Sequence, residues 1–138
     1  GINYHFLTRP EFEKRIAENQ FIEYARVLDN YYGTEIAELD RIFKQGKYPI
    51  LDIDVQGAQT LRGKELRMVS LFIVPPDMVE LERRLRARGS ETEAEIQSRL
   101  ELARLEIMEK DNFDYVVVND DLMKAAEELA QVVRTHMV

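Results

Sequence analysis

The stretch from Met68 to Val118 decides the fold, because it opens with MVSLFIV at 68–74 and closes with FDYVVV at 113–118. Both runs are nearly continuous apolar segments rich in Ile and Val, as strands buried on both faces require. Between them the sequence predicts helices over 77–88 and 91–110. A strand, helices and a strand in this order predict a crossover connection between parallel strands.

Outward from this stretch, the rest of the chain predicts one α/β domain, 1–138, with two parts. A third apolar run at 48–53 predicts another strand of the same sheet, and 121–135 predicts a closing helix. We therefore expect a mostly parallel sheet flanked by helices over 47–138, and a smaller subdomain of mixed strands over 1–46.

The smaller subdomain shows helix caps and short strands. The predicted elements, in order, are a strand over 2–7, a helix opened by the capping box of Thr8 and Glu11, a strand over 21–28, a turn at Asp29 and Asn30, and a helix capped by Thr34 that ends at Gly46. A second capping box, Thr92 with Glu95, opens the long helix of the sheet region.

Composition excludes several classes of function. The 138 residues carry 19 basic and 26 acidic side chains, a net charge of −7, which argues against a nucleic-acid partner. No run approaches the ~18 apolar residues of a membrane span. With no cysteine, disulfides, thiolate zinc sites and cysteine nucleophiles are excluded, and a reducing cytoplasm fits. With two histidines, any chemistry rests on Asp, Glu, Arg, Lys and Tyr.

The sharpest local feature is LDIDVQG at 51–57, where Asp52 and Asp54 end an apolar run. Burying an unpaired ionised group costs several kcal/mol, so both carboxylates should face a polar crevice, a metal ion or a basic partner. A helix cap or a structural ion pair is the alternative interpretation for each of them.

An arginine cluster follows on the 77–88 helix. It comprises Arg83, Arg84, Arg86 and Arg88, and Arg99 lies on the next helix. Guanidinium groups this close repel one another unless an anion or several carboxylates share the site, and arginine suits bidentate phosphate contacts. We favour a phosphate site for the cluster. The alternative is a solvated helix face paired with Glu80 and Glu82. Gly89 allows the segment between the helices to bend, as a closing lid must.

Glu23 is a carboxylate in an apolar strand, where strand alternation places it on one face with Phe21 and Ala25. Such a carboxylate needs hydrogen-bond donors. Guanine offers two adjacent donors, N1–H and the N2 amino group, and its O6 accepts from a hydroxyl such as that of Thr34. Adenine presents the opposite pattern, so a site of this kind discriminates between the bases.

A phosphate loop of the form G-x-x-x-x-G-K-[ST] is absent from these 138 residues. Gly57 to Lys64 and Gly46-Lys47 come closest, and we interpret both as ordinary helix ends.

Several blocks in conventional order together resemble guanylate kinase over essentially the whole chain. They are FIEYA at 21–25, NYYGT at 30–34, LDIDVQG at 51–57, Pro75-Pro76, the arginine block 83–89 and VNDD at 118–121. The resemblance implies a P-loop-kinase-type fold with a helical lid around 77–110, and transfer of the γ-phosphoryl group of ATP to GMP with Mg²⁺. A monomer or homodimer acting in the cytoplasm is expected.

The resemblance also implies roles for individual residues. The GMP-binding residues would be Tyr4, Glu23, Tyr32, Gly33, Thr34 and Asp54, with the two tyrosines donating to the GMP phosphate. Arg84, Arg88 and Arg99 would be the catalytic arginines that close on the phosphates, Asn119 would lie near ATP, and Asp52 would hold the magnesium.

The chain departs from the family pattern at its start. The family begins with a strand, a phosphate loop and its helix, and this first βα unit is missing here, so we expect little kinase activity and weakened GMP binding from these residues alone. A non-catalytic guanylate-kinase-like module that binds a phosphopeptide or protein partner is the main alternative, and a kinase acting on a sugar phosphate is another. Retention of the guanine contacts favours the enzyme.

Overall fold

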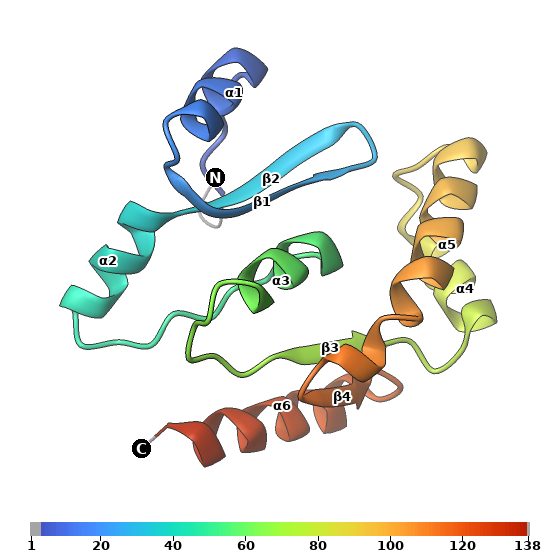
Figure 1. Cartoon of the computed structure of the whole chain (residues 1–138). Helices are drawn as coiled ribbons and strands as arrows, with labels where there is room; N and C mark the ends of the chain where they lie inside the picture. Colours follow the sequence, from blue (N-terminus) through green and yellow to red (C-terminus); the bar gives the residue numbers. More distant parts are fainter. Residues whose placement is uncertain (1–3, 138) are drawn as a thin grey trace. The chain divides into compact units, whose positions relative to one another are not determined.

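The computed structural model describes residues 4–137, and the chain divides into two compact units, Gly1–Leu66 and Arg67–Val138 (Figure 1). The first unit contains α1 (Arg9–Ala17), β1 (Phe21–Val27), β2 (Asn30–Glu35), α2 (Ile36–Lys44) and α3 (Val55–Arg62). The second contains β3 (Leu71–Val74), α4 (Met78–Arg88), α5 (Glu93–Ile107), the 3-10 helix η1 (Lys110–Asn112), β4 (Tyr115–Val118) and α6 (Leu122–His136).

The first unit is built on an antiparallel hairpin of β1 and β2, in which Glu23 pairs with Thr34 and Ala25 with Tyr32. The register shifts between Phe21 and Glu23. The ring of Phe21 lies where a side chain at position 33 would project, and residue 33 pairs with Tyr24 rather than with Glu23. Phe21 and Glu23 therefore face opposite sides of the hairpin, and the expectation that they share a face is wrong because strand alternation fails at such an irregularity.

Each side of the hairpin packs against a helix. On the Phe21 side, Phe12 of α1 stacks on Phe21 with 4.5 Å between ring centroids, and Tyr31 lies 5.3 Å from Phe12. The capping box of Thr8 and Glu11 opens α1 as expected. On the Glu23 side lies the first turn of α3, so the unit has a helix on each face of a two-stranded sheet.

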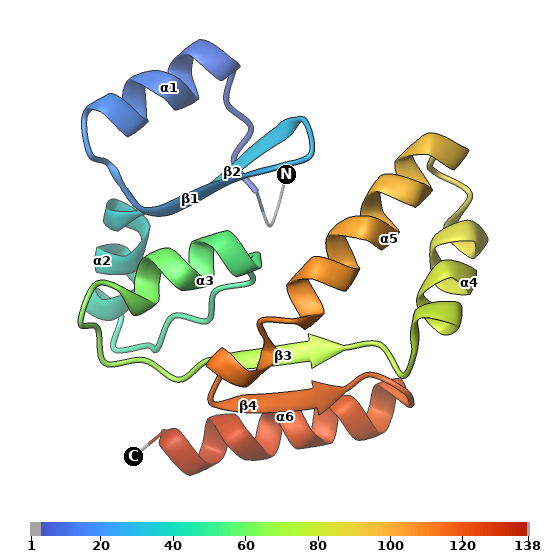
Figure 2. The same ribbon diagram turned by 45° about the vertical axis from the view of Figure 1, so that its right-hand side comes forward.

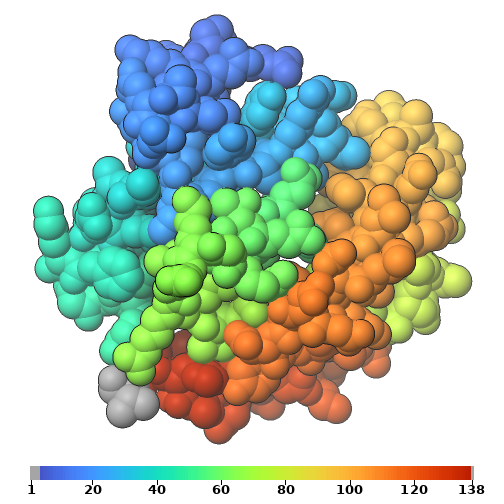
Figure 3. Space-filling view, viewed as in Figure 1, coloured from blue at the N-terminus to red at the C-terminus, as the bar shows by residue number. Residues whose placement is uncertain are grey.

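The second unit pairs β3 and β4 in parallel, from Leu71 opposite Tyr115 to Val74 opposite Val118 (Figure 2). The helices α4 and α5 form the connection between these strands, and α6 runs along β4. A core of Leu85, Ile96 and Leu100 joins α4 to α5. The outer side of α5 forms part of the yellow-to-orange surface in Figure 3. The α/β class and the parallel crossover are confirmed.

Two expected strands are not found. Residues 47–54 belong to no helix or strand, and Ile50 within them is 80% exposed, so the strand expected over 48–53 is wrong. An apolar run does not supply the partner that a strand requires. Of the strand expected over 2–7, residues 2 and 3 lie outside the described residues, and 4–7 form no strand. The two sheets of the described chain have two strands each, so the parallel sheet is narrower than expected.

Thr34 does not cap the following helix. It lies inside β2, where the sequence predicts a turn and a helix cap, and Glu35 occupies the N-cap position of α2 without a side-chain hydrogen bond. The hydroxyl of Thr34 is bonded across the hairpin to Glu23 instead. The helix ends at Gly46 and Gly63 are as expected: Gly46 follows α2 with φ of 71°, and Gly63 caps α3.

Candidate functional site

Glu23 is the centre of the polar cluster in the first unit, and its exposed fraction is only 3%. The Thr34 hydroxyl donates a hydrogen bond of 2.6 Å to its Oε1 atom. Burial raises the pKa of Glu23, and the nearby Asp54 carboxylate acts in the same direction, whereas the Thr34 hydrogen bond lowers it. The net shift is upward. The unit therefore holds a desolvated carboxylate whose hydrogen-bond donors are neutral groups of Thr34, and further donors would stabilise its charged form.

Gly57 makes room for this carboxylate. A Cβ atom on Gly57 would lie 2.3 Å from Glu23 Oε2 and 3.4 Å from Asp54 Oδ1, closer to the first than any real contact. The amide of Gly57 donates a 3.0 Å hydrogen bond to Asp54 Oδ1, which makes Asp54 the N-cap of α3. The cap interpretation of Asp54 is thus confirmed. The same cap brings Asp54 to Glu23, so capping and a place in the cluster are compatible.

Two tyrosines lie beside this cluster. Tyr32 pairs with Ala25 on the Glu23 side of the hairpin, and its ring meets that of Tyr4 edge-on with 6.3 Å between centroids. Both tyrosines are about half-exposed, at 52% for Tyr4 and 47% for Tyr32. Gly33 lies on the other side, where a Cβ would meet Phe21 at 2.9 Å, so its visible role is in packing.

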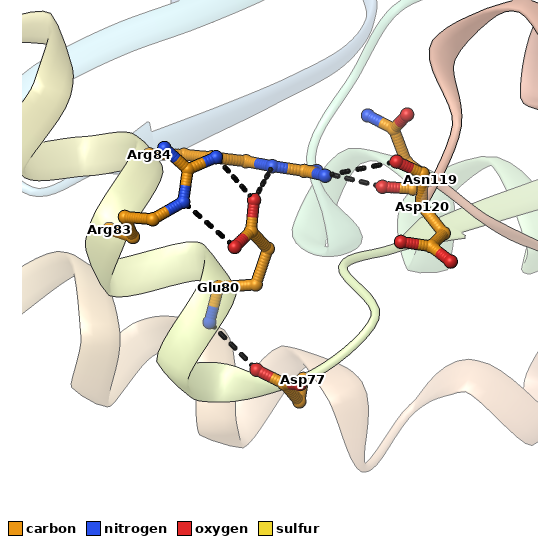
Figure 4. A network of polar contacts seen from close by, with 6 residues as sticks. All are labelled: Asp77, Glu80, Arg83, Arg84, Asn119 and Asp120. Carbon is orange, nitrogen blue, oxygen red and sulfur yellow. Dashed lines mark hydrogen bonds and ion pairs between the residues drawn. The ribbon is translucent and has the colours of Figure 1, made fainter.

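Arg84 is the centre of the first of two arginine clusters in the second unit, where it contacts Glu80 and the backbone of Asn119 and Asp120 (Figure 4). Its Nε donates to Glu80 Oε1 at 3.0 Å, and its two terminal nitrogens donate to the backbone carbonyl oxygens of Asn119 at 2.7 Å and Asp120 at 3.3 Å. These bonds join α4 to the loop that follows β4. The structure therefore brings Arg84 and Asn119 together, as two of the expected nucleotide-binding positions.

Arg88 and Arg99 form the second arginine cluster with Glu91. Arg88 ends α4, Arg99 lies on α5, and Glu91 lies in the turn between these helices with a side chain only 8% exposed. Its Oε1 accepts from Arg88 Nη2 at 2.7 Å and its Oε2 from Arg99 Nε at 2.5 Å. Glu91 is not among the partners predicted from the sequence, because those partners, Glu80 and Glu82, lie on the same helix as Arg88.

The remaining arginines of the 83–88 segment fit the solvated helix face. Arg83 pairs with Glu80 at 2.6 Å, and Arg86 pairs with Glu93 at 2.5 Å, all near the surface. Hydrogen bonds from Arg83 and then Arg84 lower the pKa of Glu80 to about 2, and those from Arg86 and then Gln97 lower the pKa of Glu93 to about 2.

Residues 4–137 contain no group of three or more His, Cys, Asp or Glu side chains placed to hold a metal ion. Asp52 is exposed and lies two residues before Asp54, the N-cap of α3. In the same range, no helix combines the length and apolar character needed to cross a membrane.

Comparisons with known proteins agree on one family. The family model described as "Guanylate kinase" matches residues 1–136. The chain is 44% identical over 135 residues to guanylate kinase 1 of Oryza sativa subsp. japonica, covering 96% of the chain and 35% of that protein. It is 46% identical over 133 residues to the guanylate kinase of Colwellia psychrerythraea, covering 96% of the chain and 61% of the relative.

A solved structure shows the same likeness in three dimensions. The crystal structure of guanylate kinase from Anaplasma phagocytophilum matches with a TM-score of 0.82 and 32% identity, over 100% of this chain and 67% of the other. The chain spans about three fifths of the Colwellia relative and about a third of the rice one.

Proposed function

The chain belongs to the guanylate kinase family, and from that premise we propose that it supplies the GMP-binding, lid and core portions of a nucleoside monophosphate kinase. The reaction is transfer of the γ-phosphoryl group of ATP to GMP, giving ADP and GDP. The observation that carries the proposal is the buried Glu23 carboxylate, bonded to Thr34 and placed against Gly57. Within this proposal the enzyme is a monomer or homodimer of the cytoplasm, which suits a chain without cysteine.

Guanine would change the hydrogen bonds of Glu23. The N1–H and N2 amino groups of the base donate to the carboxylate, and the Thr34 hydroxyl is then released to donate to O6. The exchange replaces one hydroxyl donor with two donors to a charged acceptor, each worth about 1.5–3 kcal/mol. Adenine has an acceptor at N1, which would leave the carboxylate unpaired. Asp54, at the start of α3, borders the same carboxylate.

The phosphate groups would be bound by hydroxyl and guanidinium groups. We assign the hydroxyls of Tyr4 and Tyr32 to the GMP phosphate, the guanidinium groups of Arg84, Arg88 and Arg99 to the phosphates of the reacting nucleotides, and Asn119 to the ATP side. Phosphoryl transfer is mostly positioning and charge stabilisation, so a cluster of arginines without a nucleophilic side chain suits the reaction.

Magnesium is the cofactor that this reaction requires. Mg²⁺ is commonly bound through one or two carboxylates together with substrate phosphates and water, rather than in a cage made by the protein. A single exposed carboxylate such as Asp52 fits that mode, and we assign the metal to it. When bound, the ion would neutralise charge on the phosphates.

Base selectivity tests the proposal directly. Calorimetry with the 138-residue protein should rank GMP above IMP, which lacks the N2 amino group, and both above AMP. Glu23→Gln places an amide donor against the donors of guanine, and we expect it to weaken GMP binding at least tenfold. Glu38→Gln, which removes the same charge from an ion pair with Arg41 on α2, serves as the matched control. Equal affinities for GMP and AMP would refute the assignment.

Turnover requires a separate assay. Because these 138 residues contain no phosphate loop, we expect a coupled ADP-release assay to show little or no activity. Turnover at a normal kinase rate would contradict this. A phosphoserine peptide added in place of GMP tests the binding-module alternative: tight binding of the peptide without binding of GMP would favour it.

A further inference from the structure

Among the described ion pairs of the second unit, Glu91 is the most enclosed carboxylate, and it is shared by two arginines from different helices. Its side chain is 8% exposed, whereas the carboxylates that pair with Arg83 and Arg86 are 26% to 63% exposed. Gly89, in the left-handed region with φ of 65°, ends α4, and the capping box of Thr92 and Glu95 begins α5. The turn that carries Glu91 is therefore fixed at both ends.

The two arginines differ from their neighbours in how many of their donors are used. A guanidinium has five N–H donors. Among the described residues, Arg84 donates through all three of its nitrogens, and Arg83 and Arg86 each bind a carboxylate through two. Arg88 and Arg99 each donate through one nitrogen only, and both bonds go to Glu91. These two groups are held in place while most of their donors remain free for a ligand.

We propose that Glu91 is a positioning residue, which holds Arg88 and Arg99 together as a paired binding site for the phosphate groups of a nucleotide. The proposal rests on the function proposed above, which assigns both arginines to phosphate. Two guanidinium groups repel each other, and one shared carboxylate offsets that repulsion while leaving the trio a net positive charge. Fixing both side chains before the ligand arrives also removes an entropic cost from binding.

Whether anion binding becomes weaker or stronger when Glu91 is neutralised distinguishes a positioning role from a purely electrostatic one. If Glu91 acted only through its field, or only competed with phosphate for the arginines, removing its negative charge would strengthen anion binding. If it positions the arginines, removing it weakens anion binding although the site becomes more positive. Glu91→Asp adds a second comparison, because it keeps the charge but shortens the side chain by one methylene, so that it no longer reaches both arginines.

The matched control is Glu93→Gln. Glu93 lies two residues away and pairs with Arg86, to which no ligand is assigned, so the variant removes the same charge from the same region. Circular dichroism and thermal unfolding verify that each variant is folded. If Glu91→Gln fails to fold, Glu91→Asp carries the test.

Pyrophosphate is the probe, because it presents phosphate groups without a base. Its affinity is measured by calorimetry, and its place of binding by the NMR signals of the arginine Nε–H groups. We expect Glu91→Gln and Glu91→Asp each to weaken binding about tenfold, because two long side chains must then be ordered by the ligand. Glu93→Gln should change it less than twofold. The Arg99 Nε–H signal should move in both Glu91 variants before any ligand is added, and should move with pyrophosphate in the wild type.

The outcomes distinguish this inference from the proposed function. Unchanged or tighter pyrophosphate binding in both Glu91 variants would overturn the positioning role, as would a wild-type protein in which pyrophosphate leaves the Arg88 and Arg99 signals unmoved. GMP selectivity is measured at Glu23 in the first unit and would be unaffected by either result. Conversely, Glu91-dependent pyrophosphate binding without GMP selectivity would support the inference and refute the proposed function.

Discussion

Replacing Gly57 by alanine tests whether the Glu23 carboxylate is held in place by the shape of α3. The added Cβ would lie 2.3 Å from Glu23 Oε2, about 1 Å inside an ordinary van der Waals contact. Glu23 cannot swing freely, because Thr34 bonds its other oxygen and the side chain is buried. We therefore expect the carboxylate to move by about 1 Å or the helix to shift.

The magnitude follows from two opposing terms. Overpacking of this kind costs about 1–3 kcal/mol. Replacing glycine by alanine within a helix also stabilises the helix by about 0.5–1 kcal/mol. The free energy of unfolding should fall by about 1–2 kcal/mol, which lowers the melting temperature by roughly 5 °C for a chain of this size. A carboxylate displaced from the base should weaken GMP binding about tenfold, since a hydrogen bond to a charged group is worth about 1.5–3 kcal/mol.

Urea unfolding monitored by circular dichroism and GMP calorimetry measure the two effects. Gly63→Ala, at the C-cap of the same helix, is the matched control, because its Cβ would meet Thr60 O at 3.6 Å and nothing closer. It should leave both quantities nearly unchanged. In a Glu23→Ala background the clash disappears, so Gly57→Ala should then be neutral or stabilising. A cost for Gly57→Ala that is the same with and without Glu23 would refute the reasoning.

Further predictions concern charge and backbone. Because the folded-state pKa of Glu23 is raised, its ionisation opposes folding as pH rises above about 4.5; Glu23→Gln should therefore raise the melting temperature at pH 7 and lose that advantage below pH 4.5. The pKa values of Glu80 and Glu93 are lowered to about 2, so their stabilisation, present above the ordinary glutamate pKa of 4.5, should be lost as pH falls from 4.5 to 2; a variant with both residues changed to Gln should show a flatter acid unfolding profile. Gly89→Ala should cost about 1 kcal/mol in urea unfolding, because alanine is strained at φ of 65°.

Local signals in the sequence predicted the helices α1, α2, α4, α5 and α6 and the strands β1, β3 and β4, whereas β2 and α3 were not predicted. Capping boxes such as Thr8 with Glu11 involve residues three apart, so the sequence alone contains the interaction. The run at 48–53 has the apolar side chains of a buried strand, but a strand also needs a neighbouring strand for its backbone hydrogen bonds, and the run itself does not contain that partner. In the structure these residues form no strand. Thr34 was misassigned for a related reason: its hydroxyl can cap a helix or bond across a hairpin, and the choice depends on Glu23.

The sequence allowed the residues of the candidate site to be predicted, but not all of the contacts between them. Asp54, Thr34 and Glu23 were selected from the sequence, and the structure brings them together in the first unit. The role of Gly57 was not predictable, since it arises from a steric contact with a residue of β1 that becomes visible only when α3 is placed on the hairpin. Glu91 was missed in the same way, because its two partners come from different helices.

Glu23 and Glu91 show how an acidic chain of 26 carboxyl side chains can use two of them differently. Glu23 is buried with only neutral hydrogen-bond donors, all from Thr34, so its charge opposes folding, and a ligand that brings further donors would stabilise that charge. Glu91 is enclosed with two cations, so its charge is compensated, and the donors that remain free belong to its partners. Neutralising Glu23 should therefore stabilise the protein and abolish base selectivity, whereas neutralising Glu91 should destabilise it and weaken phosphate binding. Both side chains are almost fully enclosed, so burial does not distinguish them. The opposite signs of the two stability changes follow from the cationic partners that Glu91 has and Glu23 lacks among the described contacts.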